Sequence, residues 1–429
     1  MAITILSSPY LMTPRGQRLM FIASSDNSAQ PQFKYGVKVT ITSSGQVLQF
    51  FVSPDPEGKL IFDLQSVVKL SNEDSATGWH SNPFTTYVSE PLGKGIDTYN
   101  VEIQEWWVID AVLTENESAR DASDTQVFNA SLQPSYGYLP NVDTTDLPYS
   151  FALGTATAQV LTDRVIETHR WWKSDSFPIS SAPVVYIPAF DNDYGVLSFT
   201  PTALYSVNNP PYRVVYSLFN SSGMSYSANF VATETDGILH VGCYPNNISD
   251  DGTLTSTPAT TANWRYYTIQ LTNTDGQASV KYCFYNSAVW GQHDCRYDMV
   301  RLGWVNSRGG WDYFNFIKKN EYTSGIERKQ FRRVLYRNST DVFAPADRQL
   351  TDRDNIVTRN LTITSDWVQE EEYVFLKNLL FSNQVQIINA DGSQTPVSVG
   401  DSTFTEKKER NGKLYNVTLT VTQSQDYWL

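Results

Sequence analysis

Short extended runs follow one another at regular intervals through the middle of this 429-residue chain. Each run is rich in Val, Ile, Tyr, Phe and Trp, and clusters of Asn, Asp, Gly and Pro separate the runs. β-Branched and aromatic residues suit the half-buried surface of a sheet, and the separating residues suit turns. The spacing therefore predicts a central β-sandwich domain over residues 176–345. Its expected strands are VVYIPAF, GVLSFTPTALYSV, YRVVYSLFN, ILHVGCYPN, WRYYTIQLTN, ASVKYCFYN and MVRLGWVN.

A second β region precedes the central one. The run FKYGVKVTI alternates polar and apolar residues, turns at Gly45 and continues as VLQFFVSP, which predicts a hairpin. Asp63 is in place to cap a short helix, and YNVEIQEWWVID reads as a further strand. The polar stretches 114–126 and 133–150 are expected to be exposed loops. Together these signals predict an N-terminal β-sandwich-like domain over residues 1–175.

The last part of the chain, residues 346–429, differs from the rest because it contains the best helix signal. In SDWVQEEEYVFLKNLLFS we expect Asp366 or Ser365 to cap the helix. The apolar side chains that fall on one helical face are Val368, Phe375, Leu376 and Leu379. Strand-like runs follow, with a tight hairpin turn at Asn411-Gly412. The predicted fold class is mainly β, with tandem β-sandwich-like domains followed by a small α+β C-terminal domain.

Charge and hydropathy argue against two classes of partner. The formal net charge is −13, whereas general nucleic-acid binding needs a cationic surface. No apolar run approaches the length needed to cross a membrane. The first residues lack a basic segment before an apolar run, so we expect no secretion signal. We therefore predict neither nucleic acid nor membrane as a partner.

No catalytic or metal-binding motif is evident. The histidines (His80, His169, His240 and His293) and cysteines (Cys243, Cys283 and Cys295) have no ligand spacing, so we expect core or surface side chains. Asp191-Asn192-Asp193 resembles the start of a calcium loop, but Thr202 occupies the position that needs an acid, which favours an Asx-turn. We expect no cofactor, no metal and no enzymatic activity.

The abundance of Trp and Tyr leaves carbohydrate binding open, because aromatic faces pack on sugar rings. Most such residues in β proteins are core residues. Paired carboxylates for glycoside hydrolysis are a matter of spatial geometry, and a sequence with 45 acids does not test it. The Trp residues chosen to test glycan binding are Trp106, Trp107, Trp171 and Trp172.

One segment departs from the acidic character of the chain. Residues 301–340 hold nine basic and three acidic side chains, a local charge of +6. The aromatic run GWVNSRGGWDYFNF (303–316) lies within it, and Tyr, Trp and Arg are the residue types enriched at interface hot spots. Two interpretations stay open: a solvated face, or an edge that meets an acidic neighbour. The candidate interface residues are Arg308, Trp311, Tyr313, Lys318, Lys319, Arg328, Arg332 and Arg333.

A more detailed hypothesis divides this segment by role. Gly309 and Gly310 allow a sharp turn, which Trp304 and Trp311 flank. We expect the turn and its aromatic side chains, residues 303–320, to anchor the segment on the core. We expect residues 318–337 to form an assembly edge.

The line RLGWVNSRGGWDYFNFIKKNEY, followed by ERKQFRR, resembles a segment of structural proteins from tailed bacteriophages of marine, cyanobacterial and Bacteroidetes hosts. SDWVQEEEYVFLKNLLFSNQVQII near the C-terminus, and FKYGVKVTI with PEGKLIFDLQSVV near the N-terminus, fit the same resemblance. It implies a place in the virion and carries over no catalytic residue.

We therefore consider three functions, given in order of preference. The first is a non-enzymatic virion protein of the tail, neck or baseplate, assembled in the host cytoplasm as a symmetric oligomer with other virion proteins. The second is a carbohydrate-binding, receptor-recognition or glycan-active β protein, with a host surface glycan as partner. The third is a capsid decoration or head-fibre protein.

Overall fold

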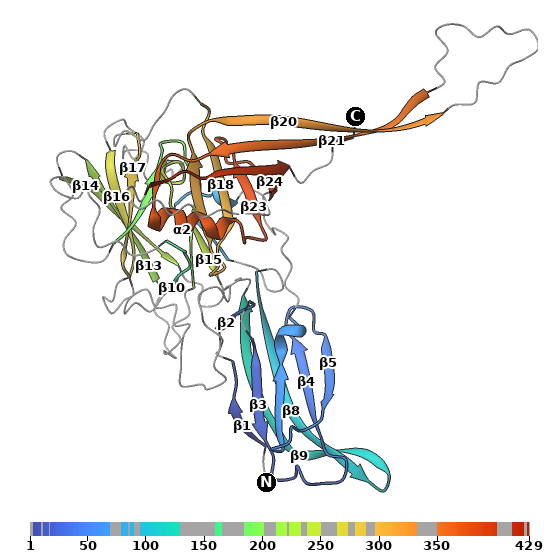
Figure 1. The fold of residues 1–429 in the computed structure, drawn as a ribbon. Helices are drawn as coiled ribbons and strands as arrows, with labels where there is room; N and C mark the ends of the chain where they lie inside the picture. Colours follow the sequence, from blue (N-terminus) through green and yellow to red (C-terminus); the bar gives the residue numbers. More distant parts are fainter. Residues whose placement is uncertain are drawn as a thin grey trace, which may run out of the picture.

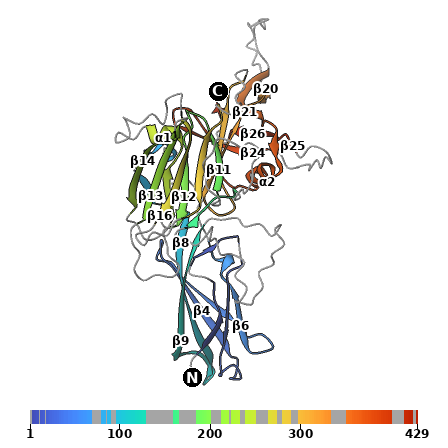
Figure 2. The same ribbon diagram turned by 90° about the vertical axis from the view of Figure 1, so that its left-hand side faces the viewer.

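The structure is a computed structural model, and the predicted fold class is confirmed: the chain is mainly β, with several antiparallel sheets and few helices (Figures 1 and 2). The residues that the structure describes are 3–9, 12–16, 18–68, 79–84, 86–89, 95–128, 159–164, 184–200, 212–220, 223–232, 238–249, 264–272, 279–288, 297–332, 350–400, 414–423 and 427–428.

The N-terminal unit consists of two sheets that enclose one apolar core. The three-stranded sheet has the order β1 (Thr4–Ser7), β3 (Met20–Ser24), β6 (Lys59–Asp63). The five-stranded sheet has the order β2 (Met12–Pro14), β9 (Val112–Phe128), β8 (Ile96–Ile109), β4 (Lys34–Ile41), β5 (Val47–Val52). Both sheets contribute buried side chains to this core, among them Phe21 and Leu60 from one and Val37 and Val101 from the other. The unit is therefore sandwich-like, as predicted.

Local signals in this unit are mostly confirmed. Strands β4 and β5 form the predicted hairpin, and Gly45 adopts φ 63° at its turn. The Asp63 carboxylate accepts a hydrogen bond from the Gln65 amide and caps a 3-10 helix, η1 (Leu64–Ser66). The loop predicted at 114–126 is wrong, because these residues belong to β9 and pair with β8. Polar side chains on both faces of β9 leave no alternation that would reveal a strand.

The central unit also has two sheets. The five-stranded sheet has the order β11 (Val184–Ala189), β17 (Lys281–Asn286), β16 (Trp264–Thr272), β13 (Tyr212–Asn220), β14 (Gly223–Ala232). The four-stranded sheet has the order β10 (Gln159–Val160), β12 (Val196–Thr200), β15 (Leu239–Gly242), β7 (Tyr87–Ser89). Two short helices lie nearby, η2 (Trp79–Ser81) and α1 (Pro245–Ser249). Strands β7 and β10 come from residues expected in the N-terminal domain. The core of the central unit therefore also contains residues that precede residue 176.

A large sheet dominates the remaining part of the chain. Its order is β19 (Trp311–Phe316), β18 (Val300–Val305), β23 (Val385–Ile388), β24 (Gln394–Val399), β26 (Thr418–Gln423), β21 (Leu350–Thr364), β20 (Asn320–Arg332), and β27 (Tyr427–Trp428) also pairs with β21. Strands from both sides of the boundary expected at 345/346 share this sheet. The hairpin turn expected at Asn411-Gly412 lies outside the described residues.

Helix α2 (Glu370–Leu379) packs its predicted apolar face against this sheet, with Phe375, Leu376 and Leu379 buried. The predicted cap is wrong. Val368 and Gln369 form a short strand, β22 (Val368–Gln369), which pairs with β25 (Leu414–Tyr415), so the helix begins only at Glu370. No side chain caps the helix at Gln369.

Candidate assembly interface

The aromatic run at residues 303–316 lies between two hydrophobic cores and contributes side chains to both. Strands β18 and β19 pair antiparallel, so Trp304 lies opposite Asp312 and Leu302 lies opposite Phe314. Side chains on one face of this hairpin, including Leu302, Trp304, Phe314 and Phe316, belong to the core beside α2. Side chains on the other face, including Trp311 and Tyr313, belong to the central core. Both faces carry large apolar side chains because both faces are buried.

The turn of this hairpin is organised by Asn306. Its side-chain oxygen accepts hydrogen bonds from the amides of Arg308 and Gly310, both at 3.0 Å. Gly309 adopts φ 84°, a conformation that favours glycine. At Gly310 a Cβ atom would lie 2.0 Å from the Leu161 carbonyl oxygen, so only glycine allows this close approach. The predicted sharp turn is therefore confirmed. Gly309 is needed for its backbone conformation, and Gly310 is needed for the close approach of Leu161.

A buried ion pair holds the hairpin against the central unit. The Arg301 guanidinium lies 3.0 Å from an Asp193 carboxylate oxygen, and both side chains are almost fully buried. The same guanidinium donates to the Asn315 side chain and the Tyr194 carbonyl, and stacks over the Tyr244 ring. Burial raises the pKa of Asp193, although Arg301 opposes this shift. The chain does turn here, but through a backbone hydrogen bond from the Asp193 amide to the Phe190 carbonyl. The Asp191 carboxylate, which was expected to form an Asx-turn, accepts a hydrogen bond from the Trp264 indole, and the Asp193 carboxylate serves the ion pair.

A second buried network binds the turn to the segment 159–164. Asp312 accepts hydrogen bonds from the Thr162 hydroxyl and the Asp163 amide. Asp163 in turn accepts from the Ser307 hydroxyl, from the Ser307 amide and from the Asn378 side chain of α2. Burial raises the pKa of both carboxyl groups, and the pKa of Asp312 reaches about 6. These contacts tie together the hairpin, helix α2 and the central unit, as expected of an anchor.

Two of the candidate interface residues are therefore misassigned. Trp311 and Tyr313 are buried inside this chain, and the Tyr313 hydroxyl lies 2.5 Å from Nδ1 of His80. They do not reach the surface of the monomer and offer nothing to a neighbour. Their residue types suited an interface, but the sheet places them in the core. The hypothesis that residues 303–320 form an anchor is supported for this hairpin.

Beyond the hairpin the chain forms a two-stranded arm, which we define as β20 and residues 350–359 of β21. Figures 1 and 2 show it projecting from the body of the molecule, away from the N-terminal unit. Twelve of the thirteen residues of β20 are exposed. A strand of that length spans about 43 Å. The short strand β27 adds a third strand to the arm at Ile356 and Val357. The rest of the arm has two strands, and a two-stranded ribbon is marginally stable by itself in water, so an arm of this length favours a contact that the isolated chain lacks.

The arm has two different faces. Residues directly opposite each other in an antiparallel pair share a face, so Tyr322, Ile326 and Arg328 lie on one side with Val357 and Arg359. Tyr322 and Ile326 are 72% and 56% exposed, which is unusual for large apolar side chains. The acidic residues Glu321 and Glu327 lie on the opposite side. We call the first side the apolar-basic face.

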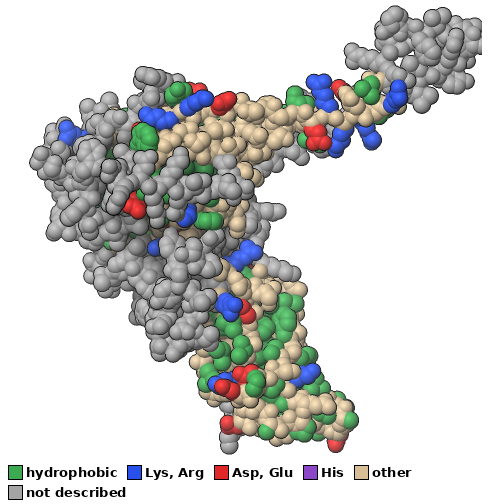
Figure 3. Space-filling model, viewed as in Figure 1, with side chains coloured by type: hydrophobic (Ala, Val, Ile, Leu, Met, Phe, Trp, Pro, Cys, Tyr) green, Lys and Arg blue, Asp and Glu red, His purple; other side chains and the backbone are tan. Residues whose placement is uncertain are grey.

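The predicted basic edge has less unpaired positive charge than the sequence indicated. Of the seven basic residues that the structure describes between 301 and 332, four have a carboxylate within 4.0 Å: Arg301, Arg308, Lys318 and Lys319. Asp352 and Asp354 on β21 also lie opposite Gln330 and Lys329. Figure 3 shows acidic side chains among the Lys and Arg side chains of the arm.

The remaining candidate residues are placed as follows. Lys318 and Lys319 lie where the arm leaves the body, and Arg328 and Arg332 lie on β20, whereas Arg333 is outside the described residues. The sequence-based list omitted Tyr322, Ile326, Phe331 and Leu350, the exposed apolar side chains of the arm. The signal that could have found them is the long run NEYTSGIERKQFR, which has apolar residues but no interruption by a turn.

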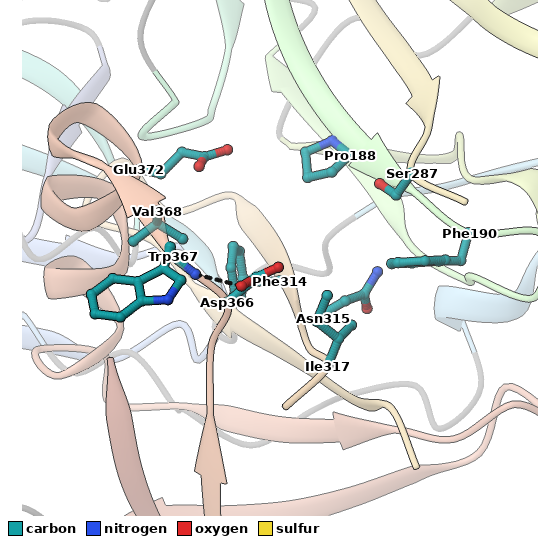
Figure 4. A pocket seen from close by; sticks show the side chains of 10 residues that line it. All are labelled: Pro188, Phe190, Ser287, Phe314, Asn315, Ile317, Asp366, Trp367, Val368 and Glu372. Atoms are coloured by element: carbon teal, nitrogen blue, oxygen red, sulfur yellow. Dashed lines mark hydrogen bonds between the residues drawn. The ribbon is translucent and has the colours of Figure 1, made fainter. Parts of the chain in front are cut away.

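A shallow crevice lies between the central unit and the start of α2. Its cavity volume is about 40 Å³, room for a few water molecules, whereas ligand pockets are typically about 300–1,000 Å³. Figure 4 shows Trp367, Val368 and Glu372 on one side of the crevice, with Pro188, Phe190 and Ser287 on the other. Trp367 is 65% exposed, and its amide donates to the Asp366 carboxylate.

The other sequence-level candidates are structural where they are described. Cys243 and Cys283 are buried free thiols, and the His240 ring lies 2.9 Å from the Ser198 hydroxyl. Across the described residues no group of three His, Cys, Asp or Glu side chains could hold a metal ion. His169, His293, Cys295, Trp171 and Trp172 lie outside those residues, as does the predicted loop 133–150.

Comparison with known proteins identifies no family for this chain. No protein-family model matches the chain, and a search of curated proteins finds no similar sequence. The resemblance to bacteriophage virion proteins therefore stays a prediction. Within the described part of the chain, no helix is long and apolar enough to cross a membrane.

Proposed function

We propose that this protein is a non-enzymatic structural component of a bacteriophage particle, in the tail, neck or baseplate, and that it assembles as a symmetric oligomer. The observation that carries the assembly role is the arm, which exposes Tyr322, Ile326, Phe331 and Leu350 to solvent in the isolated chain. Exposed apolar side chains on a projecting ribbon mark an interaction surface. The place in a virion rests on the sequence resemblance.

The anchor supports the same function. An arm transmits the position of a neighbour only if its base is rigid, and β20 follows directly after the buried hairpin of β18 and β19. The Arg301–Asp193 ion pair and the Asp312 network fix that hairpin to two cores. The projecting arm thus begins directly after a hairpin that buried contacts hold in place.

Trimming the arm is expected to abolish assembly and leave the body folded. The variant replaces residues 324–359 by Asn-Gly, which joins Thr323 to Asn360, its partner in the ladder, through a favoured two-residue turn. The pairing of β21 with β26 at residues 360–364 is retained. Light scattering with negative-stain images should show a closed oligomer for the full chain and a monomer for the variant.

A variant with Arg332→Ala and Arg333→Ala gives a milder version of the same test, and we expect weaker assembly from a folded monomer. Unchanged particles from the trimmed variant would overturn the assembly role of the arm. A melting temperature close to that of the full chain controls for loss of the fold.

Carbohydrate binding is the second candidate, and Trp367 is the observation that favours it. Trp367 lines the same crevice as Asp366 and Glu372, whose carboxylates can accept hydrogen bonds from sugar hydroxyls. If the full chain binds on a glycan array, Trp367→Ala should lower affinity up to about tenfold, the equivalent of one good aromatic contact. Val374→Ala, an exposed apolar position on the helix α2 that follows Trp367, is the matched control. Equal binding by both variants would remove Trp367 from the candidates.

A further inference from the structure

Two free sheet edges lie in different parts of the molecule. Strand β20 ends the large sheet, and strand β5 ends the five-stranded sheet of the N-terminal unit. An edge strand offers a row of backbone N–H and C=O groups that are ready to pair with another strand. Proteins usually protect such edges with charges, proline or bulges.

Strand β5 lacks these protections. Its sequence, VLQFFV, contains no charge and no proline. Val47 and Phe51 point outward, and Phe51 is 47% exposed and packs edge-to-face on Trp106, with ring centroids 5.1 Å apart. Strand β6, which ends the other sheet of the same unit, carries Lys59 and Asp63 at its ends. Such an uncharged edge beside an aromatic pair favours pairing with another strand.

We propose that the free edge of β20 in one copy pairs with the free edge of β5 in a second copy, so that one sheet continues from subunit to subunit. This inference rests on the proposed function and names the partner of the arm. Backbone hydrogen bonds provide the affinity in this kind of strand addition, and alternate side chains provide the specificity. Tyr322 and Ile326 would pack beside Val47 and Phe51 across the new pair.

The pairing has to join different copies. In Figures 1 and 2 the arm projects from the top of the molecule, whereas the N-terminal unit, which contains β5, forms the bottom. An edge that meets a different edge of the next copy gives a head-to-tail contact. Such contacts close into a ring when the rotation between copies permits it, and otherwise form a filament.

Charge favours this particular acceptor. Residues 1–128 hold eight basic and fifteen acidic side chains, a net charge of −7. The apolar-basic face of the arm carries Arg328 and Arg359 beside its apolar side chains. Opposite charge on the two partners speeds their encounter and disfavours contacts between two arms or two N-terminal units.

Phe51→Lys tests the proposed acceptor. A lysine at this position supplies the charge that natural edges use against pairing, and it repels the basic face of the arm. Ile61→Lys is the matched control, because Ile61 is 50% exposed on the edge strand of the other sheet in the same unit. In light scattering we expect Phe51→Lys to shift the oligomer to monomer and Ile61→Lys to keep it.

Cross-linking separates pairing from an indirect effect. Protein with Ile326→Cys and protein with Gln49→Cys are mixed and treated with a short bis-maleimide. We expect a cross-linked dimer from the mixture and none from either protein alone. If the full chain assembles while Phe51→Lys behaves as the control and the mixture gives no dimer, the pairing is wrong and the proposed function stands. A monomeric full chain overturns both.

Discussion

Arg301→Met is expected to lower the free energy of unfolding by about 3–5 kcal/mol, the range observed when one partner of a buried ion pair is removed. The substitution leaves the Asp193 carboxylate buried without its countercharge. The hydrogen bonds that Asp193 accepts from the Phe190 amide and the Asn315 side chain remain, but they do not replace a full positive charge. Methionine retains most of the volume of the side chain, so packing changes contribute little.

Chemical denaturation followed by tryptophan fluorescence measures this effect. The matched control is Lys318→Met, which removes an ion pair with Asp366 at 3.5 Å between side chains that are both partly exposed. Exposed pairs contribute at most about 1 kcal/mol, so the control should lie close to the wild type. Equal loss in the two variants would mean that Arg301 does not hold the hairpin by its charge.

Gly310→Ala is expected to lower the free energy of unfolding by about 3 kcal/mol, the upper part of the range for overpacking. The added Cβ would lie 2.0 Å from the carbonyl oxygen of Leu161, and backbone cannot rotate away as a side chain can. The carbonyl also accepts a hydrogen bond from the Asn306 side chain, so its displacement loosens the turn itself. Thermal and chemical unfolding of the variant check the prediction.

Gly325→Ala provides the contrasting case. Gly325 lies in the arm, and its nearest neighbour to an added Cβ is 3.9 Å away. Alanine loses less conformational freedom than glycine in a strand, so the control should be neutral or slightly more stable. A stable Gly310→Ala variant would show that the hairpin and the segment 159–164 can move apart without cost.

Several parts of the fold could be predicted because their signals are local. The β4–β5 hairpin follows from two alternating runs around Gly45, and the apolar face of α2 follows from the spacing of Phe375, Leu376 and Leu379. Asp63 caps the residues directly after it. In each case the residues that decide the structure lie within a few positions of each other, where periodicity and turn chemistry act.

The misassigned elements depend instead on residues that lie far away in the sequence. Residues 114–126 form a strand because β8 lies beside them, and α2 begins late because Val368 and Gln369 pair with a strand almost fifty residues away. The charge of 301–340 was reduced by carboxylates such as Asp193 and Asp366, which the local count excluded. A local pattern carries no information on such distant partners.

By itself, the sequence determined the β class of this protein, its turns at Gly45 and Gly309-Gly310, and the presence of an anchoring aromatic segment, because burial periodicity and backbone preference are short-range properties. Only the tertiary structure decided that Trp311 and Tyr313 lie in a core and that β20 projects as an arm with an unpaired edge. Both segments combine aromatic and basic residues. Their environments differ because long-range packing covers both faces of the β18–β19 hairpin and leaves β20 exposed.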